Sequence, residues 1–194
     1  NPHQAAAAFQ IPGDKSNSIL NAKIHQGKKL SYNNIMDADA ALSCLKEFKS
    51  TACVIVKHAN PCGVALGTNM LDVYKRAFSA DSISAFGGII AINQPCDDIL
   101  AEEISKVFVE IVLAPAFTKK SLDIFSKKKN LRVLEVGNIE KRDQLLEVRN
   151  IVGGVIVQET DTSILSSSEL KTVTDLEPSK EEINTMLFGW KVLK

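Results

Sequence analysis

The sequence lacks the features that mark nucleic-acid-binding, membrane-spanning or disulfide-bonded proteins. Its 23 lysines and arginines balance 23 acidic residues, so no net positive field draws it to nucleic acid or to an anionic membrane surface. No apolar run approaches the roughly 18 residues that span a bilayer, and no charged-then-apolar leader opens the chain. No CxxC pair joins the four cysteines, Cys44, Cys53, Cys62 and Cys96. We therefore expect a cytoplasmic protein without a disulfide framework or a cysteine zinc site, which binds neither nucleic acid nor membrane.

Two nucleotide-binding signatures are also missing. The chain contains neither the GxGxxG dinucleotide fingerprint nor the GxxxxGK[ST] phosphate loop. With no net positive charge, any anionic ligand has to be held by local groups.

Apolar strands and amphipathic helices alternate along the chain. At 45% hydrophobic and 24% charged residues, the composition is that of an ordinary globular protein. Strand, helix, strand, helix in regular succession predicts a three-layer α/β domain with a largely parallel sheet. The strands are expected at 52–56, 87–92, 109–115, 131–136 and 151–157, and the helices at 37–48 behind Asp37 as N-cap, 69–78 behind Asn69, 97–107, 118–129 and 179–194.

The domain organisation follows from the same pattern. We expect a core over about 30–157, then a polar surface excursion over about 158–178, rich in serine, threonine and acidic residues. Ser179 and Glu182 form a candidate capping box for the last helix, 179–194. No helix stop signal follows Trp190, so this helix is expected to be truncated and the chain to be a piece of a longer protein.

The most informative stretch is VIVKHANPCG, residues 54–63, in which a buried strand ends on two titratable side chains. In open α/β sheets ligands gather outside the carboxyl ends of strands, where Lys57 and His58 are expected. Asn60, Pro61 and Gly63 predict a tight turn there, which would let both side chains face one ligand. A nearby ammonium would favour the neutral imidazole that a general base needs. The alternative is a structural histidine beside a surface lysine.

Three other stretches hold candidate binding residues. In SAFGGIIA (84–91) a ligand could approach Gly87 closely while Phe86 stacks on a flat ring, although a glycine pair is also typical of a simple turn. In KLSYNN (29–34), Asn34 could recognise a carboxamide or a hydroxyl, or could serve in capping. Glu110, an acid in an apolar strand, is paired, edge-facing or ligand-facing.

Taken together, these stretches resemble a known family. NPHQ, KLSYNNIMDADAAL, VIVKHANPCGVALG, AFGGIIA, VLAPAF and LFGWKV occur here in an order that is similar to the bifunctional purine biosynthesis protein, in which an IMP cyclohydrolase domain is joined to an AICAR transformylase domain. The resemblance covers nearly the whole chain and corresponds to the first half of the transformylase domain.

The resemblance implies the activity of phosphoribosylaminoimidazolecarboxamide formyltransferase, a step of IMP biosynthesis. A formyl group passes from the cosubstrate 10-formyltetrahydrofolate to the 5-amino group of AICAR and gives FAICAR. His58 matches the family's general base, and Lys57 matches a lysine that stabilises developing charge or steers the proton. Asn34, Phe86, Gly87 and Glu110 match positions at the nucleotide site, Glu110 where some relatives have aspartate.

The resemblance also implies a cytidine-deaminase-like unit and a homodimer with sites at the subunit interface. The HxE and PCxxC zinc ligands of deaminases are absent, so Cys62 is expected to pack and no metal is expected. Most folate contacts are expected outside this chain, which alone should be inactive. The alternative function is a non-catalytic folded subdomain that supplies a packing or dimer surface.

Overall fold

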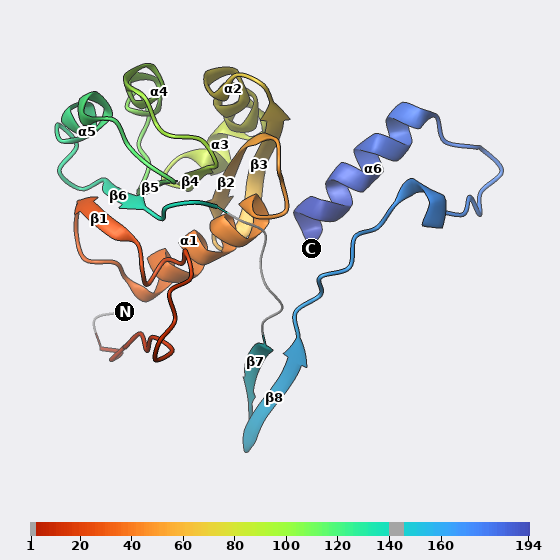
Figure 1. Cartoon of the computed structure of the whole chain (residues 1–194), viewed down its shortest axis with the longest axis horizontal. Helices are drawn as coiled ribbons and strands as arrows, with labels where there is room; N and C mark the ends of the chain where they lie inside the picture. Colours follow the sequence, from red (N-terminus) through yellow and green to blue (C-terminus); the bar gives the residue numbers. More distant parts are fainter. Residues whose placement is uncertain (1–2, 140–145) are drawn as a thin grey trace. The chain divides into compact units, whose positions relative to one another are not determined.

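The computed structural model describes residues 3–139 and 146–194, and its contacts divide the chain into two units, Asn1–Glu140 and Lys141–Lys194 (Figure 1). We describe each unit by itself. None of the helices within the described residues has the length and apolar character needed to cross a bilayer.

A mixed sheet forms the centre of the first unit. In its described residues six strands pair in the order β1-β6-β5-β4-β2-β3. β4, β5 and β6 are parallel, whereas β1 pairs with β6, β2 with β4 and β3 with β2 in antiparallel fashion. The elements are β1 (Lys23–Gln26), α1 (Tyr32–Leu45), β2 (Thr51–Lys57), β3 (Asn60–Gly67), α2 (Met70–Ala80), α3 (Ser82–Ala85), β4 (Ile89–Ile92), α4 (Asp98–Ile104), β5 (Ile111–Ala114), α5 (Lys119–Phe125) and β6 (Arg132–Glu135).

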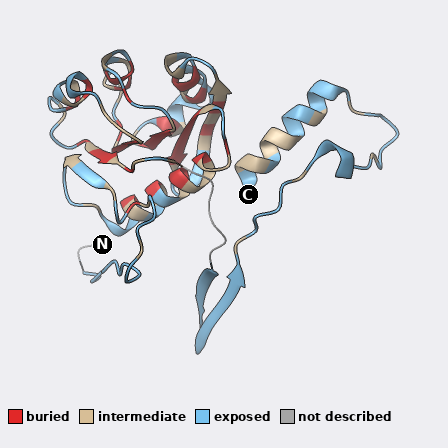
Figure 2. Ribbon diagram, in the orientation of Figure 1, coloured by how far each residue is buried: buried red, intermediate tan, exposed pale blue. Residues whose placement is uncertain are grey.

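Helices cover both faces of this sheet. α2, α4 and α5 lie on one face and α1 lies on the other (Figure 1). Alternate residues of β2 serve the two faces, as the period of two in a strand requires: Cys53 and Ile55 join the core under α2, α4 and α5. β4 and β5 are buried along their whole length (Figure 2). The predicted three-layer α/β class is therefore confirmed, with its parallel pairing in the middle of the sheet.

The helix starts show which local signals were correctly interpreted. Asn69 and Asp97 are the N-caps of α2 and α4, as predicted. The predicted N-cap Asp37 is wrong, because the N-cap of α1 is Ser31 and Asp37 lies within the helix. The Ser31 hydroxyl accepts from the backbone N–H of Asn34, and the side-chain oxygen of Asn34 accepts from the backbone N–H of Ser31, which completes a capping box.

The second unit consists of a hairpin, a short 3-10 turn and a helix. Its elements are β7 (Leu146–Ile151), β8 (Gly154–Glu159), η1 (Ser167–Glu169) and α6 (Lys180–Leu193). The predicted single strand at 151–157 is wrong, because residues 152–153 form the turn between β7 and β8. Every residue of this hairpin is exposed (Figure 2). The predicted capping box of Ser179 and Glu182 at the start of α6 is confirmed.

Candidate functional site

The tight turn that carries His58 joins β2 directly to β3. Lys57 pairs with Asn60, so the loop consists of His58 and Ala59 alone. Both have positive φ, 56° and 58°, which defines a type I′ turn. Among the described residues these are the positive-φ positions not occupied by glycine. Because the left-handed region is unfavourable for side chains with a Cβ, the backbone is strained at the tip that displays His58.

The sequence correctly indicated a turn after the strand but placed it on the wrong residues. Asn60, Pro61 and Gly63 belong to β3. Pro61 is tolerated there because β3 is an edge strand and the register shifts between Ile55 and Val56, which leaves an extra residue on β3. Gly63 is needed for close packing, since a Cβ added there would lie 2.0 Å from the carbonyl oxygen of Ala77 in α2.

Side chains brace the peptide between the two strained residues. The Ala59 N–H donates to Oδ1 of Asp37 at 2.8 Å. The carbonyl of His58 accepts from Nδ2 of Asn60, also at 2.8 Å. His58, which carries the imidazole, is exposed at the tip of the hairpin.

Lys57 links the hairpin to the segment in front of β4. Its ammonium donates to the carbonyl oxygen of Phe86 at 2.8 Å. Phe86 is 58% exposed, and its ring lies 5.4 Å from that of Phe108 at 49°. Gly87 has a φ of +72° and donates its N–H to the carbonyl of Phe108 at 2.8 Å, so a side chain there would be strained. The result is an exposed aromatic face beside an ammonium that keeps two further N–H donors.

Asn34 and Glu110 contact each other. Nδ2 of Asn34, a buried residue, donates to Oε2 of Glu110 at 2.7 Å. Oε2 of Glu110 also lies 3.7 Å from Nη1 of Arg132, whose side chain is only 12% exposed. The Glu110 side chain is 40% exposed. This pairing holds one carboxylate oxygen in place and leaves part of the carboxylate accessible.

These residues share one edge of the sheet. Lys57 ends β2, whereas Gly88, Glu110 and Arg132 precede or begin β4, β5 and β6. Because β2 is antiparallel to β4, the edge combines the carboxyl end of β2 with the amino ends of the three parallel strands. The expectation that Lys57 and His58 follow the carboxyl end of a strand is therefore confirmed, since β2 ends at Lys57.

A comparison with protein families identifies the chain. The family described as AICARFT/IMPCHase bienzyme matches residues 1–194. The chain belongs to this family. Relatives called bifunctional purine biosynthesis protein PurH are 44% identical in Caldicellulosiruptor saccharolyticus and 45% identical in Polynucleobacter asymbioticus, each over all of this chain. The chain spans 38% of the length of both relatives.

Solved structures give weaker similarities. RibD of Acinetobacter baumannii is 19% identical, with a TM-score of 0.37 over 53% of this chain and 33% of its own. A dCMP deaminase from the cyanophage S-TIM5 is 16% identical, also with a TM-score of 0.37, over 58% of this chain and 100% of its own. Likenesses of this degree say nothing about the chemistry of an AICARFT/IMPCHase chain.

In this family member, all six residues singled out in the sequence lie along the same edge. Hydrogen bonds join Lys57 to Phe86 and Asn34 to Glu110, and the backbone joins Gly87 to Phe108. Sequence reasoning missed the bracing role of Asp37 and Asn60 and the contact of Glu110 with Arg132, a partly buried cation. The S-x-x-N pattern at Ser31 was the available signal that α1 starts earlier and that Asp37 is free for another role.

The cysteines of this AICARFT/IMPCHase chain are poor nucleophiles. Burial raises the pKa of Cys44 to about 11 and that of Cys96 to about 12, and it raises the pKa of Cys53 further. Burial also raises the pKa of Cys62, whose Sγ lies 3.5 Å from the Ile55 carbonyl oxygen. Cys62 packs against the core cluster, in agreement with the packing role predicted for it.

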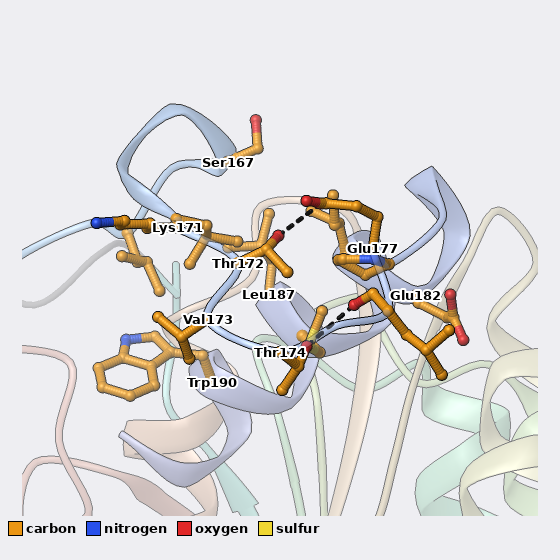
Figure 3. Close-up of a pocket in the computed structure, with 15 residues that line it drawn as sticks. Ser167, Lys171, Thr172, Val173, Thr174, Glu177, Glu182, Leu187 and Trp190 are labelled. Atoms are coloured by element: carbon orange, nitrogen blue, oxygen red, sulfur yellow. Dashed lines mark hydrogen bonds between the residues drawn. The ribbon is translucent and has the colours of Figure 1, made fainter.

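A separate apolar pocket of about 570 Å³ lies within the second unit (Figure 3). α6 contributes Met186, Leu187 and Trp190, and the segment before it contributes Val173 and Leu176. The hydrogen bond between Thr172 and Glu177 lies within its wall, as Figure 3 shows. None of the six predicted site residues lines this pocket.

Proposed function

We propose that this chain supplies the nucleotide side of a formyl-transfer site and is the first half of an AICAR transformylase domain. The reaction passes a formyl group from 10-formyltetrahydrofolate to the 5-amino group of AICAR and gives FAICAR. Family membership supports the reaction class. The single observation that carries the proposal is the joining of Lys57, Phe86 and Gly87 to the His58 turn at one sheet edge.

The chemistry requires a base. The amine of AICAR is conjugated to an imidazole that bears a carboxamide, so it is a weak nucleophile and must lose a proton as it attacks. The new N–C bond forms as the bond between the formyl carbon and N10 of the folate breaks. His58 accepts the proton of the amine, which then passes to N10 of the departing tetrahydrofolate. A positioned base of this kind contributes typically about 10²- to 10⁴-fold.

Lys57 supplies positive charge next to this base. Its ammonium is oriented by the Phe86 carbonyl and keeps two N–H donors for the oxyanion that develops on the formyl group. A preorganised charge of this kind acts mainly on kcat, because the oxyanion exists only in the transition state.

The nucleotide contacts follow from the remaining residues. The exposed ring of Phe86 offers a stacking face for the imidazole of AICAR, and Gly87 allows close backbone approach. The accessible part of Glu110 offers a carboxylate to the polar groups of the nucleotide, and the buried carboxamide of Asn34, which donates to that carboxylate, holds it in place at the nucleotide site. We expect most folate contacts outside this chain, and a cytoplasmic homodimer that completes the site.

The test is the rate of formyl transfer in a chimera in which this chain replaces the matching segment of the Caldicellulosiruptor saccharolyticus PurH protein. We expect His58→Asn to lower kcat by about 10²- to 10⁴-fold, because asparagine tolerates the left-handed turn but is no base at neutral pH. Lys57→Ala should lower kcat by at least 10-fold.

Exposed residues outside the cluster serve as matched controls. Asp39→Ala and Lys49→Ala should leave kcat within twofold of the unmodified chimera, since both side chains are exposed. An unmodified chimera without transferase activity, or a His58→Asn chimera with the reference kcat, would overturn the proposal.

A further inference from the structure

We propose that Asp37 is a positioning residue for His58: its carboxylate fixes the peptide that holds the imidazole in place. This inference rests on the proposed function, in which His58 is the base. The sequence suggested a different role for Asp37, as a helix cap, and that role belongs to Ser31.

The geometry concentrates on one peptide unit. In a two-residue hairpin loop the central peptide has no partner in the strand ladder, so its N–H and C=O must bond to something else. Here the N–H, from Ala59, donates to Asp37 at 2.8 Å, and the C=O, of His58, accepts from Asn60 at 2.8 Å. The contact with Asp37 spans 22 residues of sequence, whereas the contact with Asn60 is local. Asp37 therefore ties the turn to a different element.

The turn needs such a tie because histidine and alanine disfavour the conformation that they adopt in it. His58 and Ala59 both lie in the left-handed region, where a Cβ comes too close to the backbone and which residues other than glycine therefore disfavour. A type I turn has negative φ at both central residues and suits histidine and alanine better. It is the mirror image of the observed turn, so it would direct the Ala59 N–H to the opposite face of the hairpin, away from Asp37.

Asp37 is itself held rigidly. It lies in the second turn of α1, and the next residue, Ala38, is fully buried against the sheet, as is Ala41. The carboxylate therefore has a fixed position relative to β2 and β4. A hydrogen bond from a rigid helix to the central peptide of the turn transfers that fixed position to His58.

The consequence is a specific pattern of loss. A hydrogen bond to a charged group contributes about 1.5–3 kcal/mol, which corresponds to a 10- to 100-fold change in a conformational equilibrium. We expect Asp37→Ala to lower kcat by about 10- to 100-fold with KM within threefold. Asp37→Asn keeps an acceptor oxygen at the same place and should retain at least a third of the reference kcat.

The first experiment measures the turn directly by NMR in the 194-residue chain. A strong NOE between the amide proton and Hα of the same residue marks positive φ, and slow hydrogen exchange marks a bonded N–H. Asp37→Ala should weaken this NOE at Ala59 and speed its amide exchange at least 10-fold. Asp39→Ala, an exposed aspartate of the same helix, should change neither.

The second experiment measures kcat in the PurH chimera and adds a rescue. Glycine adopts positive φ without strain and favours the type I′ turn. Adding Ala59→Gly to the Asp37→Ala chimera should therefore raise its kcat at least fivefold. A loss caused by general unfolding of α1 would not respond to a glycine in the hairpin.

The outcomes separate this inference from the proposed function. If Asp37→Ala retains the NOE at Ala59 and the reference kcat while His58→Asn is inactive, the positioning role is wrong and the base assignment stands. If His58→Asn is fully active, the base assignment is wrong, whatever Asp37→Ala does to the turn. Loss of the NOE together with loss of kcat, both restored by Ala59→Gly, is the result that we expect.

Discussion

Replacing Ala59 by glycine should stabilise the first unit, against the usual effect of that substitution. In a strand or helix, alanine to glycine destabilises a protein because glycine loses more backbone freedom on folding. Ala59 is an exception because its φ is 58°. There the methyl group meets its own backbone, and the substitution removes that strain.

The expected magnitude follows from two opposing terms. A left-handed conformation costs a residue with a Cβ about 1–2 kcal/mol, which glycine avoids. Glycine adds about 0.4–1 kcal/mol of unfolded-state entropy that must be lost on folding. The difference is a stabilisation of about 0.5–1 kcal/mol, which corresponds to a rise in Tm of about 1–4 °C for a unit of this size.

Urea unfolding followed by far-ultraviolet circular dichroism measures this difference. Tryptophan fluorescence is unsuitable, since the one tryptophan, Trp190, lies in the second unit. Ala80→Gly is the matched control, because Ala80 is the exposed last residue of α2 with ordinary φ, and this substitution should lose stability rather than gain it. If Ala59→Gly destabilises the chain as much as Ala80→Gly does, the left-handed turn is not present and the reasoning fails.

Three further predictions concern other parts of the first unit. Gly63→Ala should destabilise it by about 3 kcal/mol or more in the same urea assay, because the new Cβ would lie 2.0 Å from a backbone oxygen of Ala77. Hydrogen bonds from Ser84 lower the pKa of Asp81 from its ordinary value of 3.8, so Ser84→Ala should raise that pKa in an NMR titration. The stability that the Asp81 carboxylate contributes is complete at pH values above 3.8, and it is lost as the pH falls through the lower pKa of the folded state. Burial raises the pKa of Cys44 to about 11, so its alkylation at pH 8, followed by mass spectrometry, should be roughly 100-fold slower in the folded chain than in urea.

Each of these has a control within the chain. Gly154→Ala has no atom within 4 Å of the new Cβ and should leave the unfolding of the first unit unchanged. Ser82→Ala should not move the pKa of Asp81. Cys53, which is fully buried, should be alkylated more slowly than Cys44 in the folded chain. Equal stability of Gly63→Ala and the original chain, an unchanged Asp81 in Ser84→Ala, or equally fast thiols in both states would contradict the respective argument.

The sequence was informative wherever one local signal determines an element. Asn69, Asp97 and Ser179 each cap the helix that follows them, and the apolar runs at β4 and β5 become fully buried strands. In these cases the capping side chain or the hydrophobic run acts within a few residues, so no knowledge of the rest of the fold is needed.

Signals that depend on tertiary packing were misinterpreted. Pro61 and Gly63 are usual turn residues, but here β3 is an edge strand with a bulge, and Gly63 makes room for the backbone of α2. The short strand β1 was not predicted, and it pairs with β6 more than 100 residues away. The predicted parallel pairing holds for β4, β5 and β6, but the antiparallel pairing of β2 with β4 was not predicted, and it decides which strand ends meet at the candidate site.

The candidate site was predictable as a set of residues but not as an arrangement. Lys57, Phe86 and Gly87 were named from their residue types and from the family resemblance. The bonds that join them, from Lys57 to the Phe86 carbonyl and from Ala59 to Asp37, depend on how α1 and β4 pack against β2. No local pattern contains that information.

Chemical rescue tests the assignment of His58 as the general base most directly. In the PurH chimera, His58→Gly keeps the turn without strain and leaves an exposed gap at the tip of the hairpin. We predict that the substitution lowers kcat by about 10²- to 10⁴-fold. Added imidazole should then raise the kcat of the His58→Gly chimera by at least about 10-fold, in proportion to the imidazole concentration. A His58→Gly chimera with the reference kcat, or one that imidazole does not accelerate, would contradict the assignment.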